Sequence, residues 1–188
     1  MSQPPDADAQ LMLAFQKGDE SAFAVLFERY RTRVLNTAYR FLNDANLAQD
    51  IAQEVFVKIY MSPKTYHPDA AFSTWLYRIT ANACIDTLRR RKRLAAVLPE
   101  AAAQSALDPA ATQADQVEAR ELERVVRAAL ASLPEKQRIA VVLQRYEGLS
   151  YKQIAEILGM SRPAIESLLF RAKQTLRVSL SAYIDCMR

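Results

Sequence analysis

Two stretches of this 188-residue sequence place basic side chains at helical spacing, and the chemistry they suggest is the binding of phosphate groups. The first stretch ends in RRRKR (89–93), where five basic residues are consecutive. A basic helix end can follow a nucleic-acid backbone, with an affinity that falls steeply with salt. The alternative is that these basic residues only interact favourably with the dipole at the C-terminal end of the helix, but five charges are more than that interaction needs. Trp75 and Tyr77 could stack on unpaired bases, although the core is the alternative place for Trp75. The candidates for polar contact on this helix are Arg78, Asn82, Arg89, Arg90 and Arg93.

The second stretch, LSYKQIAEILGMSRPAIESLLFRAKQTL (149–176), has the pattern of two helices that meet at a glycine corner. Gly159 would form the corner, and Ala155 is small enough to let the helices cross closely. This pattern is typical of a helix-turn-helix, whose second helix presents its exposed first half to base edges of DNA. An ordinary helical hairpin with a solvated polar face is the alternative. The exposed side of the second helix would carry Arg162, Pro163, Glu166, Ser167, Phe170, Arg171 and Lys173.

A third candidate surface is acidic and lies on a helix expected over about 47–61. One side of this helix is apolar and would face the core, and the other side carries Asp50, Gln53, Glu54 and Val57. Because like charges repel, an acidic face with an apolar edge suits a basic protein surface better than DNA. The alternative is that this face is simply exposed to solvent and binds no partner.

The residues that catalysis or metal binding would need are scarce. The sequence holds one histidine, His67, and two cysteines, Cys84 and Cys186, which do not form a zinc-ligand pattern. It also lacks a phosphate-binding loop. We therefore expect no cofactor, no metal and no enzymatic activity. The N-terminus lacks a basic-then-apolar leader and no apolar run reaches membrane length, so we expect a cytoplasmic protein without membrane insertion.

The elements that must position these residues are helices, because the chain has only three glycines. Apolar periodicity predicts a short helix before Gly18, helices over about 21–42, 47–61 and 72–93, and a loop at 62–70. The segment 94–116 contains no Lys or Arg and is typical of a linker, although a surface helix broken by prolines is the alternative. We expect an all-α protein of two small helical domains joined by a flexible linker: a disordered tail (1–9), a first domain (10–93), the linker (94–116) and a second domain (117–188).

Capping signals predict the helix boundaries of the second domain. Capping boxes are expected at Ser132 with Glu135 and at Ser150 with Gln153, and Ser161 is the expected N-cap of the last helix. Each cap contributes about 1 kcal/mol. The resulting helices run over about 116–131, from SLPEKQ (132–137) to Gly148, over 151–158, and from 162 to about 180.

Taken together, four segments resemble the extracytoplasmic-function (ECF) subfamily of bacterial RNA polymerase sigma factors. They are KGDESAFAVLFERY (17–30), DANLAQDIAQEVFVKIY (44–60), AFSTWLYRITANACIDTLRRRKR (71–93) and LPEKQRIAVVLQRYEGLSYKQIAEILGMSRPAIESLLFRAKQTLR (133–177). The likeness spans both domains and leaves out only the tail ends and the linker. It implies a sigma-two-like helical bundle followed by a sigma-four-like helix-turn-helix domain.

The resemblance implies roles for the matching positions. The third helix would bind the coiled coil of the polymerase β′ subunit through Asp50, Gln53 and Glu54. The second domain would read the −35 element and bind the β-flap, and the linker would thread the polymerase channel. The fourth helix and the loop before it would bind the −10 element of promoter DNA and hold a flipped base at Asn82, with Tyr66, Phe72 and Arg78 nearby.

Two departures from the family pattern bear on promoter specificity. Pro163, Glu166 and Leu168 stand where the family often has a Gly-Thr-Val run with basic residues, so Arg162, Phe170, Arg171 and Lys173 would carry more of the reading. TYHPDAAF (65–72) replaces an Arg-Gly-Asp-like loop. The family also implies an anti-sigma partner. The alternative readings are an autonomous helix-turn-helix regulator, which would bind duplex DNA without polymerase, and an enzyme acting on nucleic acid.

Overall fold

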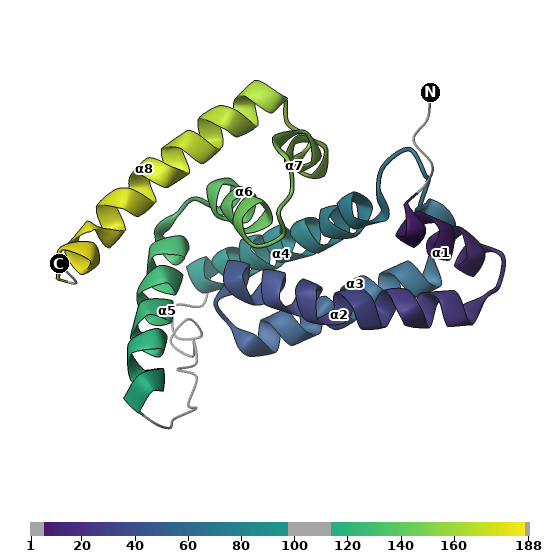
Figure 1. Cartoon of the computed structure of the whole chain (residues 1–188), viewed down its shortest axis with the longest axis horizontal. Helices are drawn as coiled ribbons and strands as arrows, with labels where there is room; N and C mark the ends of the chain where they lie inside the picture. Colours follow the sequence, from purple (N-terminus) through teal and green to yellow (C-terminus); the bar gives the residue numbers. More distant parts are fainter. Residues whose placement is uncertain (1–5, 98–113, 187–188) are drawn as a thin grey trace.

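The computed structural model describes residues 6–97 and 114–186, which form eight α-helices and one short 3₁₀ helix (Figure 1). These two ranges contain no strand, so the predicted all-α class is confirmed. Within them, no helix is long and apolar enough to cross a membrane. Most of the predicted linker and the first part of the predicted tail lie outside the described residues.

The first domain consists of α1 (Ala7–Gln16), α2 (Glu20–Leu42), α3 (Ala45–Met61), the 3₁₀ helix η1 (Pro63–Thr65) and α4 (Phe72–Val97). The carboxylates of Asp6, Asp19 and Asp44 accept backbone N–H groups at the starts of α1, α2 and α3. Asn43, with φ of 55°, ends α2 in a left-handed conformation and turns the chain directly into α3. The long helices α2 and α3 therefore pack side by side, and α4 packs against both.

The second domain consists of α5 (Ala114–Ser132), α6 (Glu135–Arg145), α7 (Tyr151–Leu158) and α8 (Arg162–Cys186). The predicted capping box is present at the start of α7, where Ser150 and Gln153 exchange hydrogen bonds. Gly159 ends α7 with φ of 61°, a conformation that disfavours any residue with a Cβ. The Ser161 hydroxyl accepts the Ala164 N–H at 3.4 Å, which confirms the expected cap of α8.

Several predicted boundaries differ from the structure. Helix α1 begins inside the expected tail, α4 continues to Val97 inside the expected linker, and α8 continues to Cys186. The capping box expected at Ser132 is wrong, because α5 includes this residue and its hydroxyl donates to the Ala129 carbonyl at 2.7 Å. Pro134 occupies the N-cap position of α6 without a side-chain hydrogen bond.

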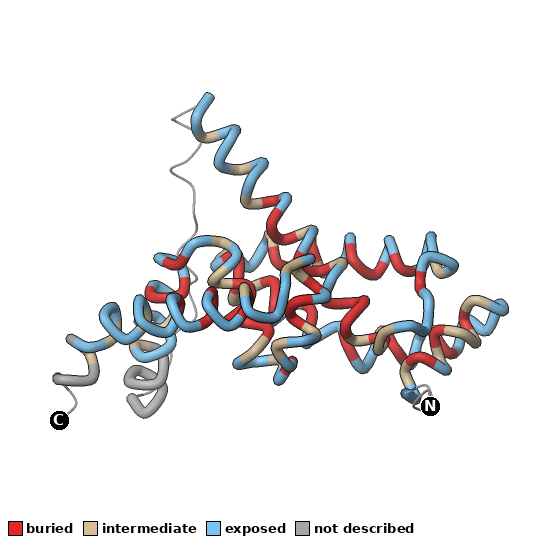
Figure 2. Tube along the Cα trace, turned by 90° about the horizontal axis from the view of Figure 1, so that it is seen from above, coloured by how far each residue is buried: buried red, intermediate tan, exposed pale blue. Residues whose placement is uncertain are grey.

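The two domains are in direct contact. Helix α7 lies against α4, and α5 and α6 lie against α2. Buried residues of both domains form one continuous apolar cluster, which runs through the middle of the trace in Figure 2 (red). The described residues of the two domains therefore form a closed arrangement.

Candidate nucleic-acid interface

Helices α7 and α8 form the predicted helix-turn-helix. Ile154 and Ala155 of α7 and Ile165 and Leu169 of α8 are buried where the two helices meet. Between the helices, the Met160 N–H donates to the Ala155 carbonyl at 3.0 Å and closes the corner after Gly159. The local signals in the sequence predict this unit well, because its caps and its turn all lie within a few residues of one another.

The seven residues predicted for the open side of α8 are all exposed. Arg162 and Glu166 form an ion pair at 3.0 Å one helical turn apart, so part of the positive charge at the start of α8 is already neutralised. Phe170 is 63% exposed, which is unusual for a large apolar side chain and suits contact with a thymine methyl group. The remaining exposed positions on this face are Pro163, Ser167, Arg171 and Lys173.

The candidates on α4 fall into separate groups. Asn82, Arg90 and Arg93 line a cavity of about 220 Å³ between α3 and α4, together with Lys58 and Glu54. The Asn82 amide can pair with a base edge and the three cations with phosphate, and the carboxylates of Glu54 and Asp86 also line the cavity. The structure thus brings together three residues that the helical spacing had predicted on one side.

Two other candidates on α4 lie elsewhere. Arg78 lines a different pocket, together with Trp75 and with Glu156 of α7. Arg89 lies toward α6, where its Nε is 4.0 Å from a carboxylate oxygen of Glu135. In the closed arrangement these two arginines therefore face the second domain and not the Asn82 cavity.

The expectation that Tyr66 and Phe72 contact DNA directly is corrected by their burial. Each is 1% exposed, and both pack edge-on within an aromatic cluster that includes Trp75. The Tyr66 hydroxyl donates to the Ala70 carbonyl at 3.2 Å, and burial raises the pKa of Tyr66 to about 12. These rings hold the loop before α4 in place. Trp75 is a core residue, which confirms the alternative to base stacking that the sequence left open.

The acidic face of α3 is present as predicted. Asp50, Gln53, Glu54 and Val57 are all exposed, and Val57 is 60% exposed. Beside this face the structure shows an apolar groove of about 310 Å³ between α2 and α3, which the sequence analysis did not identify. Its lining includes Phe27, Leu35, Ala52, Gln53 and Phe56. The apolar residues of α2 were the available signal, because Phe27 and Leu35 lie beside its buried face and are only partly covered by the core.

Two polar residues of the second domain make contacts that the sequence did not predict. Arg138 is half-buried, the Glu147 side chain is only 4% exposed, and both bond to groups of α2 or α4. Nothing in the local pattern pointed to them, because their partners lie far away in the sequence.

The fold and these surfaces define a helical protein with a helix-turn-helix, built from two domains that each carry basic, exposed side chains. Comparison with known families agrees with this class. Residues 26–94 match the family described as sigma-70 region 2, and residues 123–176 match sigma-70 region 4.

Individual proteins give the same result over nearly the whole chain. The RNA polymerase sigma-H factor of Pseudomonas aeruginosa is 35% identical, over 93% of this chain and 94% of that protein. The ECF RNA polymerase sigma factor SigW of Bacillus subtilis is 31% identical, over 88% and 92%. The chain therefore belongs to the ECF subfamily of RNA polymerase sigma factors.

Solved structures share the fold. CnrH, solved in complex with the cytosolic domain of CnrY, matches with a TM-score of 0.72 and 27% identity, over 94% of this chain and 99% of that chain. RpoE of Bartonella quintana, solved in complex with the anti-sigma factor NepR, matches with a TM-score of 0.69 and 22% identity, over 85% and 96%.

Proposed function

We propose that this sigma factor uses three surfaces: one on α3 that binds core polymerase, and one each on α4 and α8 that bind promoter DNA. The observation that carries this proposal is that the candidates on α3 and α8, and Asn82, Arg90 and Arg93 on α4, are exposed on a well-packed scaffold. Exposed, chemically distinct side chains on rigid helices are what a binding protein requires.

The surface on α3 binds core polymerase. Its carboxylates at Asp50 and Glu54 attract a basic partner. Val57 and the groove beside Gln53 supply apolar surface, and its burial against the partner favours binding. The coiled coil of the β′ subunit is the partner that the family resemblance implies.

The surface on α4 captures the −10 element in its melted form. A base that enters the cavity beside Asn82 must leave the stack, which costs a few kcal/mol. Pairing with the Asn82 amide and phosphate contacts from Arg90 and Arg93 offset this cost. The face of α8 around Arg171 and Lys173 reads the −35 element as a duplex.

Each DNA contact is too small to bind tightly alone, and the polymerase platform joins them. Once one element is bound on the platform, binding of the other becomes effectively intramolecular. Control by an anti-sigma factor is part of this proposal, since the similar sigma factor RpoE of Bartonella quintana was solved with one. An autonomous regulator would instead bind its duplex tightly without polymerase.

Run-off transcription with purified core polymerase tests the proposal, combined with permanganate footprinting of melted thymines. We expect specific transcripts and reactive thymines only when the sigma factor is present. Asp50→Lys should weaken core binding and lower transcript yield, because it places a cation against a basic partner. Glu123→Lys is the control, since it reverses an exposed carboxylate in the other domain. Tight duplex binding without any association with core polymerase would overturn the proposal.

A further inference from the structure

A carboxylate lies on the exposed side of α8, near the start of the helix. Arg162, Glu166 and Phe170 are spaced four residues apart, so their side chains follow one another along one side of α8. The side chain of Glu166 is 47% exposed and that of Arg162 is 70% exposed. The first half of a recognition helix is the part that reaches base edges in the major groove. Glu166 therefore lies where base pairs are distinguished.

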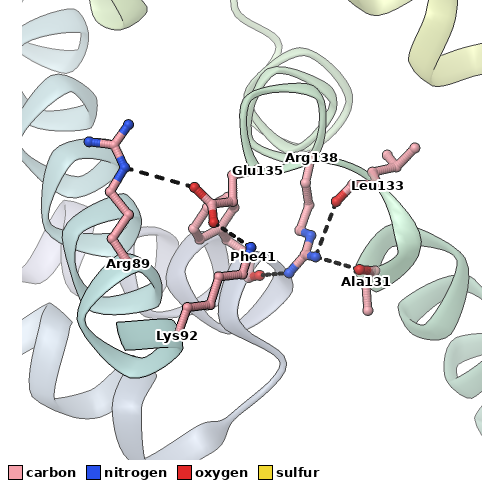
Figure 3. Close-up of polar contacts among 7 residues, drawn as sticks. All are labelled: Phe41, Arg89, Lys92, Ala131, Leu133, Glu135 and Arg138. Carbon is pink, nitrogen blue, oxygen red and sulfur yellow. Dashed lines mark hydrogen bonds and ion pairs between the residues drawn. The ribbon is translucent and has the colours of Figure 1, made fainter. Parts of the chain in front are cut away.

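The ion pair that Glu166 makes does not hold the fold together. The carboxylate of Glu135 shows the contrast, because it accepts Lys92 at 2.7 Å, lies 4.0 Å from Arg89 and so joins α6 to α4 (Figure 3). The pair of Arg162 and Glu166, at 3.0 Å, lies within α8 and joins no two helices. Its removal should leave the packing of the helix-turn-helix unchanged.

The order of the two charges also gives this pair little value for helix stability. Arg162 is the first residue of α8, where a cation opposes the helix dipole, and Glu166 lies beyond the first turn. Pairs four residues apart stabilise a helix less when the cation comes first. Exposed ion pairs contribute little in any case. The pair is therefore better explained by a contact with a ligand than by the stability of α8.

A carboxylate on this face must discriminate between bases, because phosphate groups repel it. It offsets this repulsion only where it accepts a hydrogen bond from an amino group. In the major groove, guanine and thymine present acceptors, whereas cytosine and adenine present an amino group. Adenine also places its N7 acceptor beside that amino group, and N7 repels a carboxylate. Cytosine presents its N4 amino group without such an acceptor, so it is the base that suits Glu166.

Arg162 is placed to position the carboxylate for this contact. Its Nε donates to Oε1 of Glu166 at 3.0 Å. An exposed glutamate otherwise samples several rotamers, and restricting them before binding lowers the entropy that is lost on binding. The cation also reduces the repulsion between the carboxylate and nearby phosphates.

We propose that Glu166 is a specificity-determining residue for the −35 element: its carboxylate, held by Arg162, accepts the N4 amino group of a cytosine and rejects the other bases at that position. This inference rests on the proposed function, in which α8 reads the −35 element as a duplex. It adds a repulsive group to that reading, and repulsion of wrong partners is one of the two ways in which specificity is achieved.

Promoter selection by the holoenzyme measures this preference. The full chain with core polymerase selects from a pool of duplexes that carry a randomised segment, and sequencing gives the base frequencies at each position. We expect an upstream and a downstream motif for the parent, with a preferred cytosine in the upstream one. Glu166→Gln keeps the size of the side chain, and its amide pairs with N6 and N7 of adenine. This variant should replace that cytosine with adenine and leave the other positions unchanged.

Two further variants separate the roles within the pair. Glu123→Gln is the matched control, because Glu123 is an exposed carboxylate of α5 that lies 4.0 Å from Arg127, four residues away, and is not part of α8. It should select the parent motif. Arg162→Ala should lower the frequency of cytosine at the Glu166 position without favouring another base, because the carboxylate remains but is no longer held.

Fluorescence anisotropy with selected duplexes gives the magnitude. Two duplexes that differ only at this position, with cytosine or adenine, are titrated with holoenzyme. The parent should bind the cytosine duplex at least about fivefold more tightly, and Glu166→Gln should reverse the order. Glu166→Ala should bind both duplexes within about twofold and should bind the adenine duplex more tightly than the parent does, since a repelled charge is gone.

The outcomes distinguish a failure of this inference from a failure of the proposed function. An upstream motif that lacks a preferred cytosine, or that keeps it in Glu166→Gln, would overturn the role of Glu166 and leave the assignment of α8 to the −35 element intact. A parent holoenzyme that selects a downstream motif but no upstream one would overturn that assignment, and the role of Glu166 with it.

Discussion

Replacing Asn82 with alanine should separate promoter melting from promoter binding. Asn82 is exposed and lines the cavity between α3 and α4 with Arg90 and Arg93. Because the side chain is not part of the core, the substitution should change the free energy of unfolding by less than about 0.5 kcal/mol. The loss should therefore be visible only when a base occupies the cavity.

The expected loss in open-complex formation follows from the hydrogen bonds that the Asn82 amide can make. An asparagine that pairs with a base edge through both of its polar atoms is worth about 1–3 kcal/mol, which corresponds to a factor of about 5 to 150 in the open-complex equilibrium. Closed-complex formation uses duplex contacts and should change by less than about twofold. Asn36→Ala, on an exposed face of α2, is the matched control for an amide outside the cavity.

Two assays on one promoter distinguish the steps. Permanganate reactivity of the −10 thymines reports the open complex, and a gel-shift measurement at low temperature reports the closed complex. Equal losses in both, or no loss in either, would refute the assignment of Asn82 to a captured base. A lowered melting temperature of the Asn82→Ala protein would show instead that the residue supports the fold.

Four further outcomes are expected. Phe170→Ala should weaken −35 duplex binding about 5- to 20-fold in fluorescence anisotropy with an unchanged melting temperature, because the ring is exposed. Ile154→Ala should cost about 2–5 kcal/mol in chemical denaturation, since the side chain is fully buried between α7 and α8; a loss below 1 kcal/mol would contradict this packing. Burial raises the pKa of Cys84 to about 12, so mass spectrometry should find it unalkylated at pH 8 in the native chain and alkylated in denaturant. The pKa of Tyr66 is about 12 in the folded protein and near 10 when unfolded, so the buried phenol contributes its full stability below pH 10. This contribution is lost between pH 10 and 12, and the resulting fall in the free energy of unfolding should be smaller in Tyr66→Phe.

Local signals in the sequence predicted the helix-turn-helix and the exposed faces of α3 and α8. The capping box at Ser150 and the left-handed Gly159 act within a single turn of chain, so their effect can be read without knowing the rest of the fold. The failed capping box at Ser132 shows the limit of this reasoning. The motif was present, but packing extended α5 through the residue that should have capped α6.

Periodicity predicted which side of a helix is apolar, but not what covers it. Tyr66 lies in a loop with no period, and its burial against Phe72 and Trp75 depends on this loop packing onto the start of α4. Similarly, the groove between α2 and α3 arises because Phe27 and Leu35 of α2 are only partly covered. A helical wheel counts apolar residues and contains no information on their partners.

The sequence by itself determined the helical class, the basic and acidic faces, and the helix-turn-helix with its corner, since all of these depend on interactions between near neighbours in the chain. Only the tertiary structure decided that the domains close on each other. Glu147 bonds to Thr37 and Tyr77, which lie 110 and 70 residues away. Its role depends on which distant donors the folded chain brings to it, and no local pattern encodes that choice.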